Sequence, residues 1–113
     1  MTMANPYRGE VDAILDGKRW TLCLTLGAIA ELERAFQVED MTALVERFAG
    51  GKLSARDATR IIGAGLRGAG HPIEDDQVSR MMADGGAVGF AGIVTELLVA
   101  TFGTAEGEGA DPS

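Results

Sequence analysis

Two side chains in this sequence carry chemistry that enzymes often use, and each stands alone. His71 is the only histidine and precedes a proline in an expected loop, and a metal site or a catalytic dyad there would need partners of the right type nearby. Cys23 is the only cysteine, and it could act as a nucleophile only beside a base or a helix N-terminus that stabilises its thiolate. On an expected strand among threonines, it is better explained as a small packing residue. We therefore expect His71 to be a solvated loop residue and neither residue to be catalytic.

Two further stretches resemble binding motifs but lack essential parts of them. The glycine-rich stretch GAGLRGAG, residues 63–70, has no Lys-Ser/Thr pair for phosphate and magnesium, and it follows a helical pattern instead of a strand. The acidic run EDD, residues 74–76, lacks the spacing of a calcium loop. Close helix packing at Gly63, a helix C-terminus at Gly68 or Gly70, and N-capping by the acidic run are the better explanations. No cofactor and no metal ion is expected.

Three arginines follow one face of an expected helix. Arg56, Arg60 and Arg67 are spaced by four and seven residues and form a basic stripe. Such a stripe is usually a solvated face, but in a chain with a net charge of −7 it is also a candidate docking strip for an acidic partner. These arginines and Trp20 are the residues for which we predict partner contacts. No nucleophile, base and oxyanion site come together in the sequence, so we do not expect an enzyme.

The composition indicates one small acidic domain. The chain has 113 residues, of which 46% are hydrophobic and 5% aromatic, enough for a single modest core. Its 17 acidic residues against 10 basic ones argue against binding to nucleic acid or to an anionic membrane. A single cysteine excludes an intramolecular disulfide, the N-terminus lacks a signal-peptide pattern, and the longest nearly uncharged run, residues 85–95, is shorter than a membrane span. We expect a cytoplasmic protein.

The N-terminal part has the pattern of a β-hairpin. Hydrophobic and polar residues alternate in residues 10–15 and again in residues 18–24, where Trp20 shares a face with two leucines. The dipeptide Asp-Gly between the two segments predicts a tight turn, because both residues tolerate positive φ. A two-stranded hairpin alone is marginal in water, so we expect its Trp20 face to pack against the helix that follows.

Helical spacing of apolar residues then appears in five segments. The expected helices begin near Leu26, Met41, Ala55, Glu74 and Ala87. Thr25, Asp40 and Ser54 precede the first three as N-caps. The last helix, residues 87–102, is apolar on most sides, and we expect it to be the central and most buried helix.

These patterns predict an α+β, mainly helical fold in which an N-terminal β-hairpin packs on a bundle of about five helices. Residues 1–8 are expected to be a flexible lead-in and residues 9–102 a single α+β domain. Residues 103–113 are rich in glycine and acidic residues and contain no large apolar residue, so we expect a disordered acidic tail.

Three stretches carry a resemblance to a known family. They are NPYRGEVDAILDGKRWTLCLTLGAIAELE from Asn5, LSARDATRIIGAGLRGAG from Leu53 and DGGAVGFAGIVTELLVATF from Asp84. The chain resembles the small tail protein encoded in gene transfer agents, phage-like particles of alphaproteobacteria built from siphophage-type head and tail genes. The resemblance covers residues 5–102. Its most specific pieces are Gly9-Glu10, TLGAIAELE and IIGAGLRGAG, and none of them is a catalytic motif.

The resemblance implies a role in tail assembly. The family is described as phage tail tube proteins or, by function, as tail assembly chaperones. Such chaperones bind the tape measure protein before the tail exists, keep its hydrophobic helices soluble and help recruit tail tube subunits around it. The resemblance therefore implies the tape measure protein and tail tube subunits as partners. The hairpin would brace the helices and offer an edge strand for client contact or for self-association as a homo-oligomer.

Two alternatives remain open from the sequence. The first is a structural tail tube or minor tail component that is retained in the particle. Tube subunits are mostly β, and a single hairpin with five helices disfavours this alternative. The second is a small cytoplasmic regulatory or adaptor module without any connection to tails, which rests on composition alone.

Overall fold

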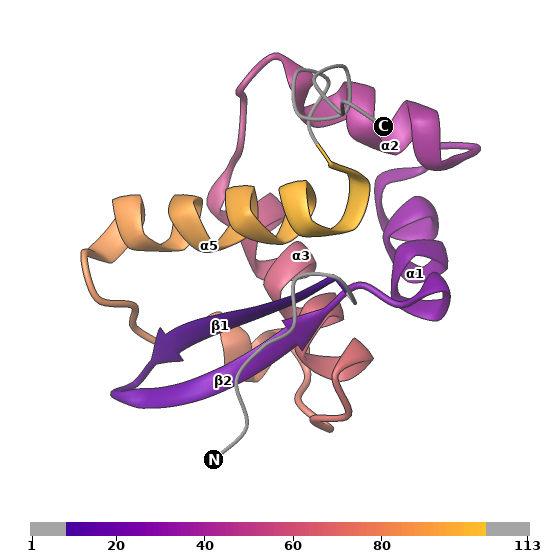
Figure 1. Ribbon diagram of the computed structural model, residues 1–113. Helices are drawn as coiled ribbons and strands as arrows, with labels where there is room; N and C mark the ends of the chain where they lie inside the picture. Colours follow the sequence, from indigo (N-terminus) through magenta and orange to yellow (C-terminus); the bar gives the residue numbers. More distant parts are fainter. Residues whose placement is uncertain (1–8, 104–113) are drawn as a thin grey trace, which may run out of the picture.

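A computed structural model describes residues 9–103, which form a β-hairpin followed by helices (Figure 1). The elements of this described part are β1 (Glu10–Leu15), β2 (Lys18–Cys23), α1 (Leu26–Phe36), α2 (Met41–Ala49), α3 (Ala55–Gly68), α4 (Asp75–Val78) and α5 (Gly86–Phe102). The predicted α+β, mainly helical fold is confirmed. The predicted lead-in, residues 1–8, lies outside the described residues, as does the predicted tail except for Gly103.

The hairpin has the register that the sequence predicts. The strands are antiparallel, with Ala13 opposite Trp20, and the turn residues Asp16 and Gly17 have φ of 55° and 75°. Positive φ at both positions is the geometry of a tight turn that matches the twist of the two strands. The turn is also anchored from outside, because the Asp16 amide donates to the Met82 carbonyl oxygen at 2.8 Å.

The predicted N-caps begin the first three helices. Thr25 Oγ1 accepts the Ala28 amide at 3.1 Å at the start of α1, and Asp40 Oδ1 accepts the Ala43 amide at 2.8 Å at the start of α2. At α3 the capping box is complete, since Ser54 accepts from the Asp57 amide while Asp57 accepts from the Ser54 amide. Each cap satisfies amides that have no partner inside the helix.

The centre of the fold is α3. From Ile61 to Leu66 all of its residues are buried, and α1, α4, α5 and β2 pack around it. Glycines permit these close approaches: a Cβ at Gly65 would come within 2.8 Å of Leu97 Cδ2, and one at Gly68 would collide with the Cys23 carbonyl oxygen. The predicted close packing at Gly63 is confirmed, because a Cβ there would collide with the carboxylate of Asp75 in α4.

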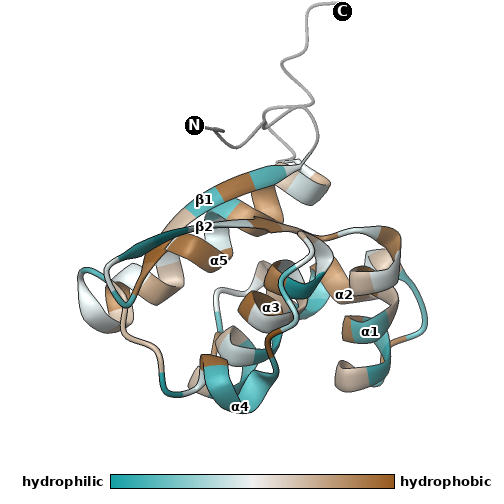
Figure 2. Cartoon of the chain, turned by 90° about the horizontal axis from the view of Figure 1, so that it is seen from below, coloured by the Kyte–Doolittle hydropathy of each residue, from teal (hydrophilic) through white to brown (hydrophobic). Residues whose placement is uncertain are grey.

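The predicted central position of α5 is wrong. Only Val94 and Leu97 of this helix are buried, and Val88 is 80% exposed. The reason is that α5 packs against β1 and α3 on one side, while its outer face is covered by no described element (Figure 1). Figure 2 shows that hydrophobic residues nevertheless continue along this helix. None of the helices in residues 9–103 combines the length and hydropathy needed to cross a membrane.

The hairpin also packs on a different helix from the one predicted. It lies mainly on α3 and α5, not on α1, the helix that directly follows it. The absence of a side chain at Gly65 and Gly68 lets β2 come closer to α3 than a helix with larger residues would allow. The hairpin therefore closes one side of the core that α3 organises.

Candidate functional site

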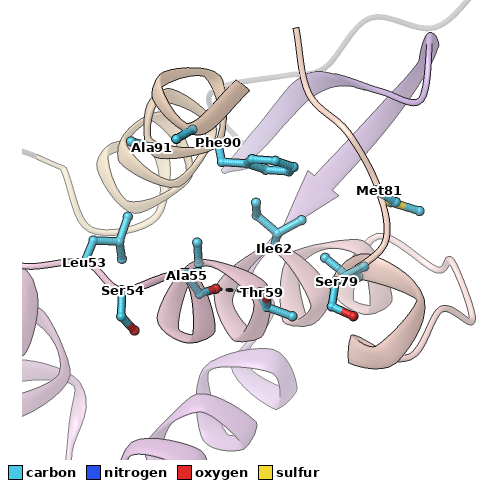
Figure 3. Close-up of a pocket in the computed structure, with 12 residues that line it drawn as sticks. Leu53, Ser54, Ala55, Thr59, Ile62, Ser79, Met81, Phe90 and Ala91 are labelled. Atoms are coloured by element: carbon cyan, nitrogen blue, oxygen red, sulfur yellow. Dashed lines mark hydrogen bonds between the residues drawn. The ribbon is translucent and has the colours of Figure 1, made fainter. Parts of the chain in front are cut away.

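An apolar groove lies between α3, α5 and the chain around α4 (Figure 3). Its volume is about 260 Å³, and its larger apolar lining residues are Leu53, Ile62, Val78, Met81 and Phe90. Figure 3 shows the ring of Phe90 reaching from α5 over Ile62, with Leu53 and Met81 at opposite ends. Ile62 is 1% exposed and forms the floor, whereas Leu53, Met81 and Phe90 are half-buried walls. The groove is thus an open extension of the core.

The hydroxyl groups around the groove are already hydrogen-bonded within the protein. Ser54 Oγ accepts the Asp57 amide at 3.0 Å, Thr59 Oγ1 donates to the Ala55 carbonyl oxygen at 2.8 Å, and Ser79 Oγ donates to the Asp76 carbonyl oxygen at 2.7 Å. The groove therefore offers mainly apolar contact and few directed polar groups. Such a surface suits apolar side chains better than a small polar substrate.

Exposed apolar residues continue outward from the groove. Ala87 and Ala91 form part of its lining on α5 and are exposed, as is the neighbouring Val88. On the other side Met82, which follows the lining residue Met81, is 70% exposed. Several adjoining apolar residues without a cover are typical of a protein interaction surface.

Arg67, one of the predicted contact residues, joins three elements of the fold. Its guanidinium forms ion pairs with Glu31 of α1 and with Asp75 of α4, the latter at 3.0 Å, and donates to the Ile73 carbonyl oxygen at 2.8 Å. Burial lowers the pKa of Arg67, but hydrogen bonds and charge interactions with Glu31 and Asp75 outweigh it and leave the pKa above its ordinary value. These partners give Arg67 a structural role.

Replacing Arg67 by methionine is expected to lower the free energy of unfolding by about 2 kcal/mol, because the partly buried Asp75 loses its cation. The matched control is Arg80→Met, which removes an exposed ion pair with Asp76 and should cost less than about 0.5 kcal/mol. Urea unfolding followed by circular dichroism measures both variants. Equal stabilities of the two variants would contradict the structural role of Arg67.

Arg56 and Arg60 lie on the first half of α3 and have no such partners. Neither forms a salt bridge with a residue in 9–103; Arg56 is exposed, and Arg60 is half-buried. Lys52, four residues before Arg56, is also exposed and outside every salt bridge of the described chain. We refer to Lys52, Arg56 and Arg60 as the basic strip. It differs from the predicted stripe in that it includes Lys52 and excludes Arg67.

Trp20, the remaining predicted contact residue, packs within the protein. Its Nε1 donates to the Leu15 carbonyl oxygen at 3.2 Å, and its ring meets the ring of His71 edge-on with centroids 5.0 Å apart. His71 lies in a loop, as predicted, but it is half-buried at this contact and is not fully solvated. The pair connects β2 to the loop after α3.

Cys23 and the acidic run, residues 74–76, also lie in surroundings that give them structural roles. Cys23 is half-buried at the end of β2. In the acidic run, Asp75 faces Arg67, Asp76 pairs with Arg80 at 2.7 Å, and the Glu74 amide donates to Gln77 Oε1. The carboxylates of Asp75 and Asp76 turn to different partners and do not converge, and no cluster of potential metal ligands occurs among residues 9–103.

The structure thus separates the four predicted contact residues. Trp20 lies at the hairpin, Arg67 lies between α1 and α4, and only Arg56 and Arg60 remain together on an accessible surface. The groove was not predicted. A sequence signal did exist in the nearly uncharged α5, whose many apolar residues we interpreted as a sign of burial.

Comparison with known proteins places the chain in a family. A family model described as "Phage tail tube protein, GTA-gp10" matches residues 8–104, nearly the whole chain. No curated protein and no solved structure matches significantly. The match confirms the resemblance to the gene transfer agent and phage tail family. The chain belongs to the family of phage tail tube proteins described as GTA-gp10.

Proposed function

We propose that this protein is a non-enzymatic tail assembly chaperone of a phage-like gene transfer agent. In this role it binds the tape measure protein in the cytoplasm of the producing cell and helps tail tube subunits to assemble around it. The proposal depends mainly on one observation: the sheet of residues 9–103 has only two strands, and helices make up most of the rest. A subunit that builds a continuous β wall needs a larger sheet.

The uncovered apolar surface supports the same proposal. A chaperone of hydrophobic helices needs an accessible apolar region in an otherwise soluble protein, and the groove with its exposed neighbours is such a region. The net charge of −7 keeps a protein that exposes this surface soluble. Both properties fit a protein that holds a client temporarily.

The second candidate is a tube or minor tail component that remains in the particle. The family description, which names tail tube proteins, favours it. In that case the exposed face of α5 would be covered by neighbouring subunits in the finished tail.

Two experiments test the proposal. The first is co-expression with the tape measure protein of the same gene cluster, followed by affinity capture. The second is quantitative mass spectrometry of purified particles. We expect the tape measure protein to be captured and this protein to be absent from particles. Many copies per particle would establish the structural alternative. If the tape measure protein is not captured and this protein is also absent from particles, both candidates are overturned.

A further inference from the structure

We propose that the groove between α3 and α5 binds an amphipathic helix whose apolar stripe is flanked by acidic residues. This inference rests on the proposed function for the existence of a client. It deepens that function by naming the surface that binds the client and the chemistry of the bound segment.

The apolar part of the proposal follows from the groove itself. Phe90 and Leu53 are held against the core from one side and remain open on the other. Met81 and the exposed Met82 add flexible, polarizable side chains that adapt to different apolar partners. A helix that inserts residues at every third and fourth position would extend the core across this opening.

The backbone around the groove explains why the partner is a helix and not a strand. The walls from α3 and α5 are helical, so their amides and carbonyls are bonded internally. On the third side, the Met82 carbonyl oxygen accepts the Asp16 amide, and Ala83 forms a bridge with Leu15. An extended segment would find no edge strand to pair with here and would bury its own polar backbone. A helix satisfies its backbone itself.

The basic strip explains the acidic flanks. Arg56 is three residues before the lining residue Thr59, which places it about 60° around the helix axis, directly beside the groove. Lys52 precedes the lining residue Leu53. Arg60 is two residues before Ile62 and therefore lies about 160° around α3 from it, so Arg56 and Lys52 are the members of the strip that lie beside the groove. The strip is at the N-terminal end of α3, where the helix dipole adds positive potential.

Most other arginines of the described chain are neutralised. The arginines in salt bridges are Arg19, Arg47, Arg67 and Arg80. On the α4 side of the groove, Arg80 is paired with Asp76 and adds no unpaired positive charge. The positive charge next to the groove therefore comes mainly from Lys52 and Arg56 of the basic strip, and it complements carboxylates along one side of a bound helix.

Two synthetic peptides of about 18 residues test the proposal, since this length supports a helix in water. They share one stripe of leucine and alanine and differ only in their flanks, which carry glutamate in one peptide and lysine in the other. Fluorescence anisotropy with the full chain at low ionic strength measures the affinities. We expect the glutamate peptide to bind about tenfold more tightly, with a preference that decreases in high salt.

Two variants locate the binding site. The double variant Arg56→Glu and Arg60→Glu should bind the glutamate peptide about tenfold more weakly and no longer prefer it over the lysine peptide. Ala91→Trp, at an exposed lining position, should fill the groove and lower the affinity for both peptides about tenfold. The controls are Arg34→Glu, exposed on α1, and Thr95→Trp, exposed on α5 outside the groove lining. Circular dichroism verifies that each variant is folded.

The outcomes separate this inference from the proposed function. Equal binding of the two peptides, or unchanged binding by folded Ala91→Trp, would overturn the inference. If the tape measure protein is captured equally by the wild type and by Ala91→Trp, the inference fails while the chaperone function stands. If the peptides behave as expected but no tape measure protein is captured, the chaperone function fails and the groove assignment stands.

Discussion

Replacing Gly68 by alanine is expected to lower the free energy of unfolding by about 3 kcal/mol, near the upper end of the usual cost of overpacking. The new Cβ would collide with the carbonyl oxygen of Cys23 and lie 3.4 Å from Ala28 Cβ. If the clashing atom belonged to a flexible side chain, that side chain could rotate away, but the backbone carbonyl of Cys23 cannot. The clash can be relieved only if β2 moves away from α3, which would loosen the core on that side.

The matched control for Gly68→Ala is Gly92→Ala. Nothing lies within 4 Å of a Cβ built at Gly92, which is inside α5. Alanine there should raise the free energy of unfolding by about 0.5–1 kcal/mol, since it favours the helix without meeting a neighbour. Urea unfolding followed at 222 nm compares both with the wild type. Unchanged stability of Gly68→Ala would show that β2 and α3 are not in this close contact.

Features that depend on nearby residues were predictable from the sequence. The caps at Thr25, Asp40 and Ser54 involve partners three residues away, so the sequence contains both members of each pair. The turn at Asp16 and Gly17 depends in the same way on the conformational freedom of its own residues. These local rules were enough to predict the hairpin, the helices and the α+β class.

Features that depend on distant packing were not predictable from the sequence. The groove joins Leu53, Met81 and Phe90 from three segments, and no local pattern indicates that they meet. Arg67 appeared equivalent to Arg56 and Arg60 along the chain. Its partner Glu31 is 36 positions away, and only the folded chain makes the distinction.

The burial of α5 is the clearest case of this limit. Hydropathy shows that the helix is apolar, but a helix that is apolar on most sides has no preferred face from which its position could be inferred. Burial on all sides and an uncovered interaction face produce the same pattern. The fold decides between them by placing β1 and α3 on one side only.

Leu97→Ala tests this one-sided packing and is expected to lower the free energy of unfolding by about 3 kcal/mol. Leu97 is 0% exposed and lies against Gly65, where no side chain can move in to fill the space that the mutation leaves. Truncation of buried leucines costs about 2–5 kcal/mol, depending on how far the site can collapse. Thermal and urea unfolding of the full chain measure the effect.

The matched variant on the same helix is Val88→Ala. Because Val88 is 80% exposed, its truncation removes little buried area, and the higher helix propensity of alanine compensates, so stability should stay within about 0.5 kcal/mol of the wild type. A large loss of stability for Val88→Ala would mean that the outer face of α5 is covered in the isolated protein. The expected contrast instead leaves the apolar residues of that face without a role in folding, which makes them available for a partner.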